Sequence, residues 1–453
     1  MENITYLNVQ IGGIEYNKIV SLTIRHNAGD HGYATLELEV NEQTGNAFVR
    51  RADETTAVTI TTTAEGQHKT IFAGSVKSAG IAKMADYTVL HVCLVSASYQ
   101  LDMQKGNKTF QNTAATHEEV MKKAVQSLAQ IDVTVSDRAI GNIVMQYNET
   151  PWEFIKRMAS QLNATVFPSI DSMVPIISIG IPKGKGETTL STTECKTKQN
   201  NVTAGSSQGS SSMMTLQSDR YLFVGEKISA NGTDGVIGSV ECTMEAGVLR
   251  CSYGLGGGKN FTKKPAQNKS VGGRMFMGTV QAVQGDQVQV HFTDIDAGYD
   301  AGGSKWFPYS TAYSSSDGSG FYCMPEVGDT VRVFIPSNNE KDAFVASSVN
   351  KNPQANPRDK SWKAPGGKEI LLTDDGIYII CENEKLFINL TKEKGIEITS
   401  DKAIRITTDS NLVLQGNEIE LKAEGYINMG VGNASVYVDE NMIELGAESV
   451  YIN

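Results

Sequence analysis

The sequence predicts a mainly β protein of several domains, and three observations carry this prediction. The chain of 453 residues contains 43 glycines and 11 prolines, which suits many tight turns between short strands. Most apolar segments alternate with polar residues or cluster β-branched residues, as half-buried strands do. Near the C-terminus, pairs of apolar residues recur about every eight positions.

The first hundred residues predict the strands of a small barrel or sandwich. Glycine, asparagine and aspartate separate segments in which β-branched residues alternate or cluster. These segments are 6–11, 20–26, 34–40, 57–63 and 87–95.

Two helices are expected after these strands. Thr116 is a plausible N-cap for a helix over 116–131, because Glu119 stands three residues later and completes a capping box. Thr150 is the expected cap of a second helix over 150–164, with Pro151 at its first position.

The middle of the chain predicts a linker, a barrel and a connector. Residues 198–218 are polar and rich in serine and glycine, which is typical of a loop or linker. Short strands within 270–350 suit a small five-stranded barrel. Proline-rich residues 351–367 predict an extended connector to the last segment.

A periodic segment then runs over 368–453. Its strands have three to five residues and alternate apolar with polar positions, as in the pairs Ile396/Ile398 and Ile404/Ile406. This alternation indicates that one face is buried and the other is wet. One such chain covers only a thin apolar stripe and leaves strand edges that need partners.

Two assemblies would satisfy the periodic segment. A parallel β-helix of a single chain is one, although its coils normally need more residues. Three chains wound into a triangular prism would place all apolar positions on one axis, and the spacing favours this homotrimeric β-helix. The side chains expected on the axis are Ile396, Ile398, Ile404, Ile406, Leu412, Leu414, Ile419, Leu421, Ile427, Val436 and Ile443.

Charge and hydropathy exclude several classes of protein. The formal net charge of −11 argues against nucleic-acid binding by phosphate neutralisation. Residues 366–453 contain 16 acidic and 7 basic residues, a balance of −9, so this segment is a poor ligand for anionic lipids. No apolar run reaches the length of a transmembrane helix, and the N-terminus lacks the features of a signal peptide. We therefore expect synthesis in the cytoplasm.

Cysteine and histidine spacing predicts no metal site. The six cysteines form no CxxC pair and the six histidines show no ligand spacing, so neither metal nor cofactor is expected, and no catalytic residue is assigned. Cys242 and Cys251 could face each other across a hairpin. A reducing compartment, however, predicts buried free thiols.

Three segments share motifs with one family. They are GNKTFQNTAATHEEVMKKAVQ (106–126), VMQYNETPWEFIKRMASQLNATVF (144–167) and KWFPYSTAYSSSDGSGFYCMPEVGDTVRVFI (305–335). Together with the periodic C-terminus, they resemble the VgrG-type or phage hub-and-spike protein of contractile injection systems. The positions that match its motifs are Gln146, Tyr147, Glu149, Phe154, Arg157, Trp306, Pro325, Gly328 and Asp329.

The resemblance implies a domain order. Residues 1–215 would form a hub of two tube-like barrels with inserted helices, and 216–269 the rest of the hub. Residues 270–350 would be an OB-fold barrel, 351–367 the connector and 368–453 the needle. This implies a non-enzymatic spike that joins a hexameric tail tube to a three-fold, membrane-puncturing needle.

The resemblance also implies partners for this chain: two further copies, a tail-tube protein, baseplate proteins, sheath-driven machinery and the target-cell envelope. The protein would act outside the producing cell or at that envelope. No histidine follows His291, so the His-x-His apex of some needles is missing and a PAAR-like tip protein is expected. Two alternatives stay open: a trimeric receptor-binding tail fibre or adhesin, and a hub with cell-wall hydrolase activity.

Overall fold

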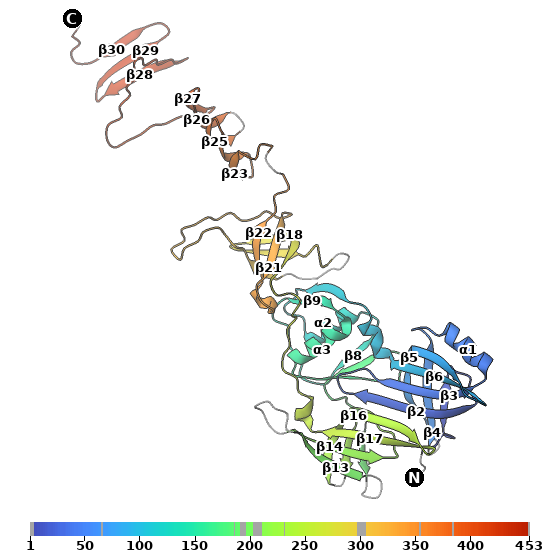
Figure 1. The fold of residues 1–453 in the computed structure, drawn as a ribbon. Coiled ribbons are helices and arrows are strands. Elements are labelled where there is room, and N and C mark those ends of the chain that lie inside the picture. The colour runs from blue at the N-terminus through green and yellow to red at the C-terminus, as the bar shows by residue number, and fades with distance from the viewer. Residues whose placement is uncertain are drawn as a thin grey trace. The chain divides into compact units, whose positions relative to one another are not determined.

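The computed structural model describes residues 4–64, 67–184, 186–190, 196–202, 211–230, 232–296, 305–352, 355–382 and 385–451. Its contacts divide the chain into two compact units, Met1–Lys351 and Asn352–Asn453. Strands dominate both units, which confirms the mainly β class (Figure 1). Among the described residues, no helix has the length and apolar character needed to cross a bilayer.

A twelve-stranded sheet organises the N-terminal part of the first unit. Its six early strands overlap all five segments predicted in the first hundred residues, although β1 covers only residues 9–11 of the segment 6–11. They are β1 (Val9–Gly12), β2 (Lys18–Asn27), β3 (Tyr33–Val40), β4 (Ala57–Ala64), β5 (Gln67–Lys83) and β6 (Thr88–Ser96). The other six are β12 (Glu187–Leu190), β13 (Lys196–Val202), β14 (Ser211–Ser218), β15 (Lys227–Ala230), β16 (Thr233–Glu245) and β17 (Val248–Gly256).

The ladder between β2 and β16 joins the two halves of this sheet. The strands run antiparallel, with Ser239 opposite Asn27 and Thr243 opposite Thr23. Inward side chains from both halves, such as Leu22, Ile24 and Tyr253, have no exposed surface and belong to one core. Strands β15, β16 and β17, which fall in the segment 216–269 assigned only to the rest of the hub, therefore complete the first sheet (Figure 1).

Two expectations for this region were wrong, and one helix was missed. Residues 198–218 are not simply a linker, because β13 and β14 pair as an antiparallel hairpin and β14 pairs with β17. Cys242 and Cys251 are directly opposed on β16 and β17 and form a disulfide rather than free thiols. Cys93 is half-buried, and Cys323 and Cys381 are exposed. The sequence also missed helix α1 (Glu42–Arg51), whose Phe48 is buried.

A second core is built around two helices. The expected capping boxes are both present: Thr116 and Glu119 at α2 (His117–Val125), and Thr150 and Glu153 at α3 (Pro151–Gln161). α2 ends earlier than predicted, because Gln126 has a positive φ and residues 130–133 pair with a strand instead. The remaining elements are η1 (Ala97–Asp102), β7 (Gly106–Phe110), β8 (Gln130–Val133), β9 (Val144–Glu149), β10 (Val166–Pro168) and β11 (Ile176–Ile179).

A five-stranded sheet forms the third core, after η2 (Gly258–Phe261). Its strands are β18 (Arg274–Gln284), β19 (Gln287–His291), β20 (Trp306–Pro308), β21 (Thr330–Ile335) and β22 (Phe344–Ser348), with η3 (Glu340–Asp342) before the last. The strand order is β20-β19-β18-β21-β22. A parallel bridge between Tyr309 and Val345 brings its two ends together, so the sheet curls toward closure.

The second unit contains two separate antiparallel sheets. One consists of β23 (Lys360–Ala364), β24 (Lys368–Leu372), β25 (Gly376–Glu382), β26 (Leu386–Thr391) and β27 (Gly395–Ser400). The other consists of β28 (Tyr426–Val431), β29 (Ala434–Asp439) and β30 (Ile443–Gly446). β23 lies inside the predicted connector, and residues 401–425 form no strand. The antiparallel pairing also contradicts a parallel β-helix of a single chain.

Two glycines of β5 provide a matched test of packing in the large sheet. A Cβ on Gly74 would lie 2.1 Å from the Val95 carbonyl oxygen, whereas a Cβ on Gly80 meets nothing within 4 Å. Gly74→Ala should lower the free energy of unfolding by about 1–3 kcal/mol, because the strands must separate to admit the methyl group. Gly80→Ala should leave it unchanged or raise it slightly. Urea denaturation compares the two, and equal effects would contradict this packing.

Candidate functional site

The motif positions of the middle segment meet where α3 and β9 contact the curled sheet of β18–β22. We call this place the junction, comprising residues 143–160 with 266–276 and the groups of β18–β22 and η3 that they touch. Ile143 and Met145, from β9 and the residue before it, belong to the core of the curled sheet. Tyr147 packs edge-on against Phe276 of β18, with ring centroids 5.0 Å apart.

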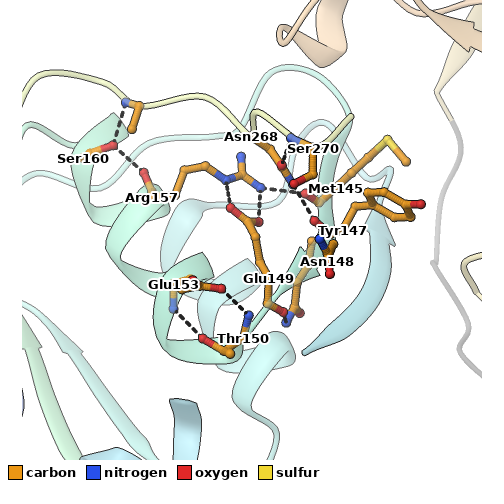
Figure 2. Close-up of polar contacts among 12 residues, drawn as sticks. Met145, Tyr147, Asn148, Glu149, Thr150, Glu153, Arg157, Ser160, Asn268 and Ser270 are labelled. Carbon is orange, nitrogen blue, oxygen red and sulfur yellow. Dashed lines mark hydrogen bonds and ion pairs between the residues drawn. The ribbon is translucent and has the colours of Figure 1, made fainter. Parts of the chain in front are cut away.

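Local sequence explains why β9 turns sharply into α3. Asn148 has a φ of 53°, a left-handed conformation that asparagine tolerates better than most residues. Its backbone N–H donates to the Asn107 side chain at 2.9 Å. The Thr150 hydroxyl then accepts from the Glu153 N–H at 3.1 Å, and the Glu153 carboxylate accepts from the Thr150 N–H at 2.9 Å (Figure 2). This box starts α3 directly after the strand.

Arg157 is the centre of the junction. Its side chain is only 6% exposed, yet its guanidinium makes four bonds to three groups. Nε and Nη2 donate to the two carboxylate oxygens of Glu149 at 2.8 and 2.9 Å, and Nη2 also donates to the Met145 carbonyl at 2.6 Å (Figure 2). Nη1 reaches Glu340 of η3 at 3.3 Å. One side chain thus ties strand, helix and curled sheet together.

The junction buries two carboxylates against a single guanidinium. Burial raises the pKa of Glu149, the hydrogen bond and charge of Arg157 oppose this rise, and nearby Glu340 adds to it. A buried bidentate pair of this kind has lost the hydration of both partners. Removing only one partner therefore leaves an uncompensated buried charge.

A second set of contacts joins the same elements. Asp296 accepts from the backbone N–H of Thr109 at 2.7 Å and from its hydroxyl at 2.5 Å. Gln111 donates to the Val290 carbonyl at 3.0 Å. Burial raises the pKa of Asp296, although both bonds from Thr109 oppose the rise. Thr109 and Gln111 lie in the first motif segment, Val290 lies in β19, and Asp296 follows that strand.

The segment that leads into β18 is fastened to the same place. The Ser160 hydroxyl accepts from the Ala266 N–H at 2.9 Å, and the Asn268 side chain donates to the Tyr147 carbonyl at 3.0 Å (Figure 2). Gln146 lies beside them and donates to the Glu149 carbonyl at 3.1 Å. Its Oε1 is buried and has no hydrogen-bond partner among the described residues.

The motif positions after residue 300 lie within the curled sheet and in a turn that contacts it. Pro325 is buried, and the Asp329 N–H donates to the Glu326 carbonyl at 3.0 Å to close a turn. Gly328 occupies its third position with a φ of 94°, which a type II turn requires. The Gly328 N–H bonds the Val280 carbonyl at 2.9 Å, which docks the turn on β18. Trp306, at the start of β20, is opposite Gln289.

The eleven positions expected on the needle axis are not covered by their own chain. Nine of them have between 56% and 71% of their surface exposed, and Ile427 and Val436 are half-buried. Six, from Ile404 to Leu421, lie in the segment without strands. A single chain gives these short segments neither a strand edge to pair with nor an apolar surface to pack on.

A buried serine and histidine and a half-buried aspartate lie together elsewhere, a grouping that sequence reasoning missed. His31 Nδ1 is 2.8 Å from the Ser98 hydroxyl and its Nε2 is 3.5 Å from the Asp102 carboxylate. Burial lowers the pKa of His31 despite that carboxylate. The Thr150 hydroxyl donates to Asp102 at 2.5 Å, so this group links the large sheet to the cap of α3. Ser98 has no exposed surface, so it does not face solvent as a nucleophile.

Within the described ranges, no group of three or more histidine, cysteine, aspartate or glutamate residues is placed to hold a metal ion. The motif residues instead form structural contacts.

Comparison with known proteins gives matches in fold but not in sequence. No family model matches the chain, and no curated protein sequence matches it significantly. An E. coli protein, c3393, is similar at 14% identity and a TM-score of 0.52, over 76% of this chain and 99% of its own. It is described as a type VI secretion component with structural similarity to the bacteriophage T4 tail proteins gp27 and gp5.

The Francisella PdpA–VgrG complex contains a second similar chain. It matches at 10% identity and a TM-score of 0.54, over 86% of this chain and 87% of its own. The chain therefore has the fold of VgrG-type hub and spike proteins, which confirms the expected resemblance.

Loss of the Arg157 guanidinium should destabilise the first unit strongly. In Arg157→Met, Glu149 and Glu340 keep their buried carboxylates without a counter-charge, and we expect a loss of about 3–5 kcal/mol in unfolding free energy. Arg25→Met removes an ion pair with Glu241 whose partners are 67% and 52% exposed, and should cost less than about 1 kcal/mol. Urea denaturation of both variants tests the contrast, and similar losses would refute the central role of Arg157.

Glu149 should also leave a signature in the pH dependence of stability. Because its pKa is raised on folding, the folded state binds this proton more tightly than the unfolded state. The unfolding free energy of the wild type, relative to Glu149→Gln, should therefore rise as pH falls from 7 toward the ordinary pKa of 4.5.

Asp53 provides the control of opposite sign. Hydrogen bonds from Thr55 and Thr56 lower the pKa of this exposed carboxyl, so its stabilising contribution is lost as pH falls. The unfolding free energy of the wild type, relative to Asp53→Asn, should therefore fall as the pH falls through the acidic range. Denaturation at several pH values measures both differences, and parallel trends would contradict these assignments.

Proposed function

We propose that this chain is the structural spike of a contractile injection system, which joins a tail tube to a membrane-puncturing needle. The fold of VgrG-type hub and spike proteins supports a structural role in a tail or secretion machine. The observation that best supports a needle is the row of exposed apolar side chains in the second unit. Charged or glycine-rich positions would be expected there if the segment worked as a single chain.

The needle is a homotrimeric β-helix in this proposal. Nine axis positions are mostly exposed although they recur regularly, so they need a cover that the chain itself does not supply. Three copies wound around one axis would bury all of them and would pair the open edges around 401–425. The acidic balance of residues 366–453 then falls on the solvated faces.

The curled sheet of β18–β22 acts as the collar between hub and needle, and we assign it the OB-fold. Its pairing order, closed by the parallel bridge between Tyr309 and Val345, is what a five-stranded Greek-key barrel requires. The large sheet before it would supply the tube-like part of the hub. Three copies would present the tube-like elements to the end of a hexameric tube.

In this proposal, the junction transmits force between the hub and the collar. A spike must pass force from hub to needle without folding at the connection. Arg157, Asp296 and Gln111 each bond across the junction, and the apolar side chains of Ile143 and Met145 enter the core of the collar. Polar bonds set the orientation and the apolar contacts resist separation.

Partners and location follow from the same proposal. The tube-like sheet binds a tail-tube protein and the baseplate, and the sheath drives the assembly against a target envelope. A PAAR-like tip protein or an effector attaches at the C-terminal end. The protein performs no catalysis and acts outside the producing cell as part of the particle.

Self-association of the full chain tests the proposal. Light scattering should give three times the chain mass of 49.0 kDa. Ile406→Asp should abolish the SDS-resistant trimer, because it buries three unpaired carboxylates around one axis, each costing several kcal/mol. Arg405→Asp, the adjacent position on the opposite face, should keep it. Stable, folded monomers of the wild-type chain would contradict the proposal.

A further inference from the structure

An arm of fourteen residues, Ser310–Cys323, leaves the collar between β20 and β21. It is held in a defined hairpin: the Phe321 N–H bonds the Tyr313 carbonyl at 2.9 Å, and the Ser315 N–H bonds the Ser319 carbonyl at 2.8 Å. Gly320 is required there, because a Cβ would lie 2.4 Å from the Tyr313 carbonyl oxygen. The arm is therefore a built element and not a loose loop.

Aromatic side chains stand on the surface of this arm. Every residue from Ser310 to Cys323 is exposed, and Tyr313, Phe321 and Tyr322 are 52%, 55% and 73% exposed. A two-stranded hairpin that covers so little of its own chain is marginal by itself. Aromatic residues are enriched in the buried centres of protein interfaces. The arm thus has the composition of a contact surface.

The composition also restricts the partner. The arm contains one charged residue, Asp317, and otherwise serine, glycine, threonine, alanine, cysteine and the three aromatics. It offers no cation to a phosphate or a lipid headgroup. A surface of this kind suits a lasting contact with another protein surface of low charge.

The base of the arm points to a copy of the same chain. The Ser310 N–H bonds the Val345 carbonyl at 2.8 Å, and the Tyr309 hydroxyl lies 2.9 Å from that of Ser348, so the arm starts beside β22. β22 is the last strand of the first unit, from which the chain passes into residues 352–453. Chains that wind together over those residues must bring their collars close to one another.

We propose that the arm of one copy packs its three aromatic side chains on residues 270–350 of a neighbouring copy. This inference rests on the trimer proposed above. A contact from the arm of each copy to the barrel of the next is head-to-tail, and a head-to-tail contact closes into a ring around a three-fold axis. The arms would lock the three collars together where the needle begins.

Photo-crosslinking of the full chain tests this contact. p-Benzoylphenylalanine replaces Tyr322 in one variant and Tyr313 in another, so that one poorly placed probe does not decide the result. Irradiation should produce covalent dimers and trimers, with the crosslinked peptides mapping to 270–350 of a second copy. The same probes in the Ile406→Asp background should give monomers only.

Each outcome is decisive. Chains that are trimeric by light scattering but crosslink only within themselves, or to residues outside 270–350, overturn the arm contact and leave the proposed function intact. Wild-type chains that remain monomeric overturn both. Crosslinks between collars that persist in Ile406→Asp would overturn the dependence of the arm contact on the needle.

Discussion

A β-strand is stable when its apolar face is covered, and the strands of the first unit meet this condition while those of the second do not. The large sheet buries Leu22, Ile24 and Tyr253 completely, whereas the apolar positions around Ile404 and Leu412 stay mostly exposed. Burying apolar surface is the main favourable term in folding, so this difference between the units is large in energy. The architecture, the proposed copy number and the proposed mechanical role all follow from that unmet requirement.

The junction shows how a β-rich chain can fasten two of its cores to each other. Interfaces between domains of one chain usually permit relative motion. Here Arg157 contacts a strand, a helix and the collar, while Asp296 bonds a strand 187 residues away in sequence. The buried guanidinium adds specificity more than stability, because its desolvation offsets most of its attraction. The packed core shared by Met145 and the collar supplies the cohesion.

Sequence reasoning succeeded where local chemistry decides structure. Alternating strands and the caps at Thr116 and Thr150 were predicted, because each depends on neighbours within a few residues. It failed where distant pairing decides: residues 198–202 and 211–218 of the polar segment form strands, since β17 offers β14 an edge. Glu149 and Arg157 were identified by their motif, but their partner Glu340 lies 183 residues from Arg157 and carries no local signal. Helix α1 was missed because it contains an interior threonine and glycine, which have low helix propensity.

The β2–β16 ladder constrains how the chain is made. Strands β1 to β6 are complete by residue 96, but β2 waits for its neighbour until residues 239–243 leave the ribosome. At roughly 5–20 residues per second, that interval is on the order of ten seconds. During it the nascent chain presents an open, hydrogen-bonding edge beside half of an unfinished core, which is a state prone to mispairing between neighbouring polysomal chains. Rapid translation of the residues between β6 and β16, or a chaperone bound at this stage, would thus reduce such mispairing and raise the yield of correctly folded chain.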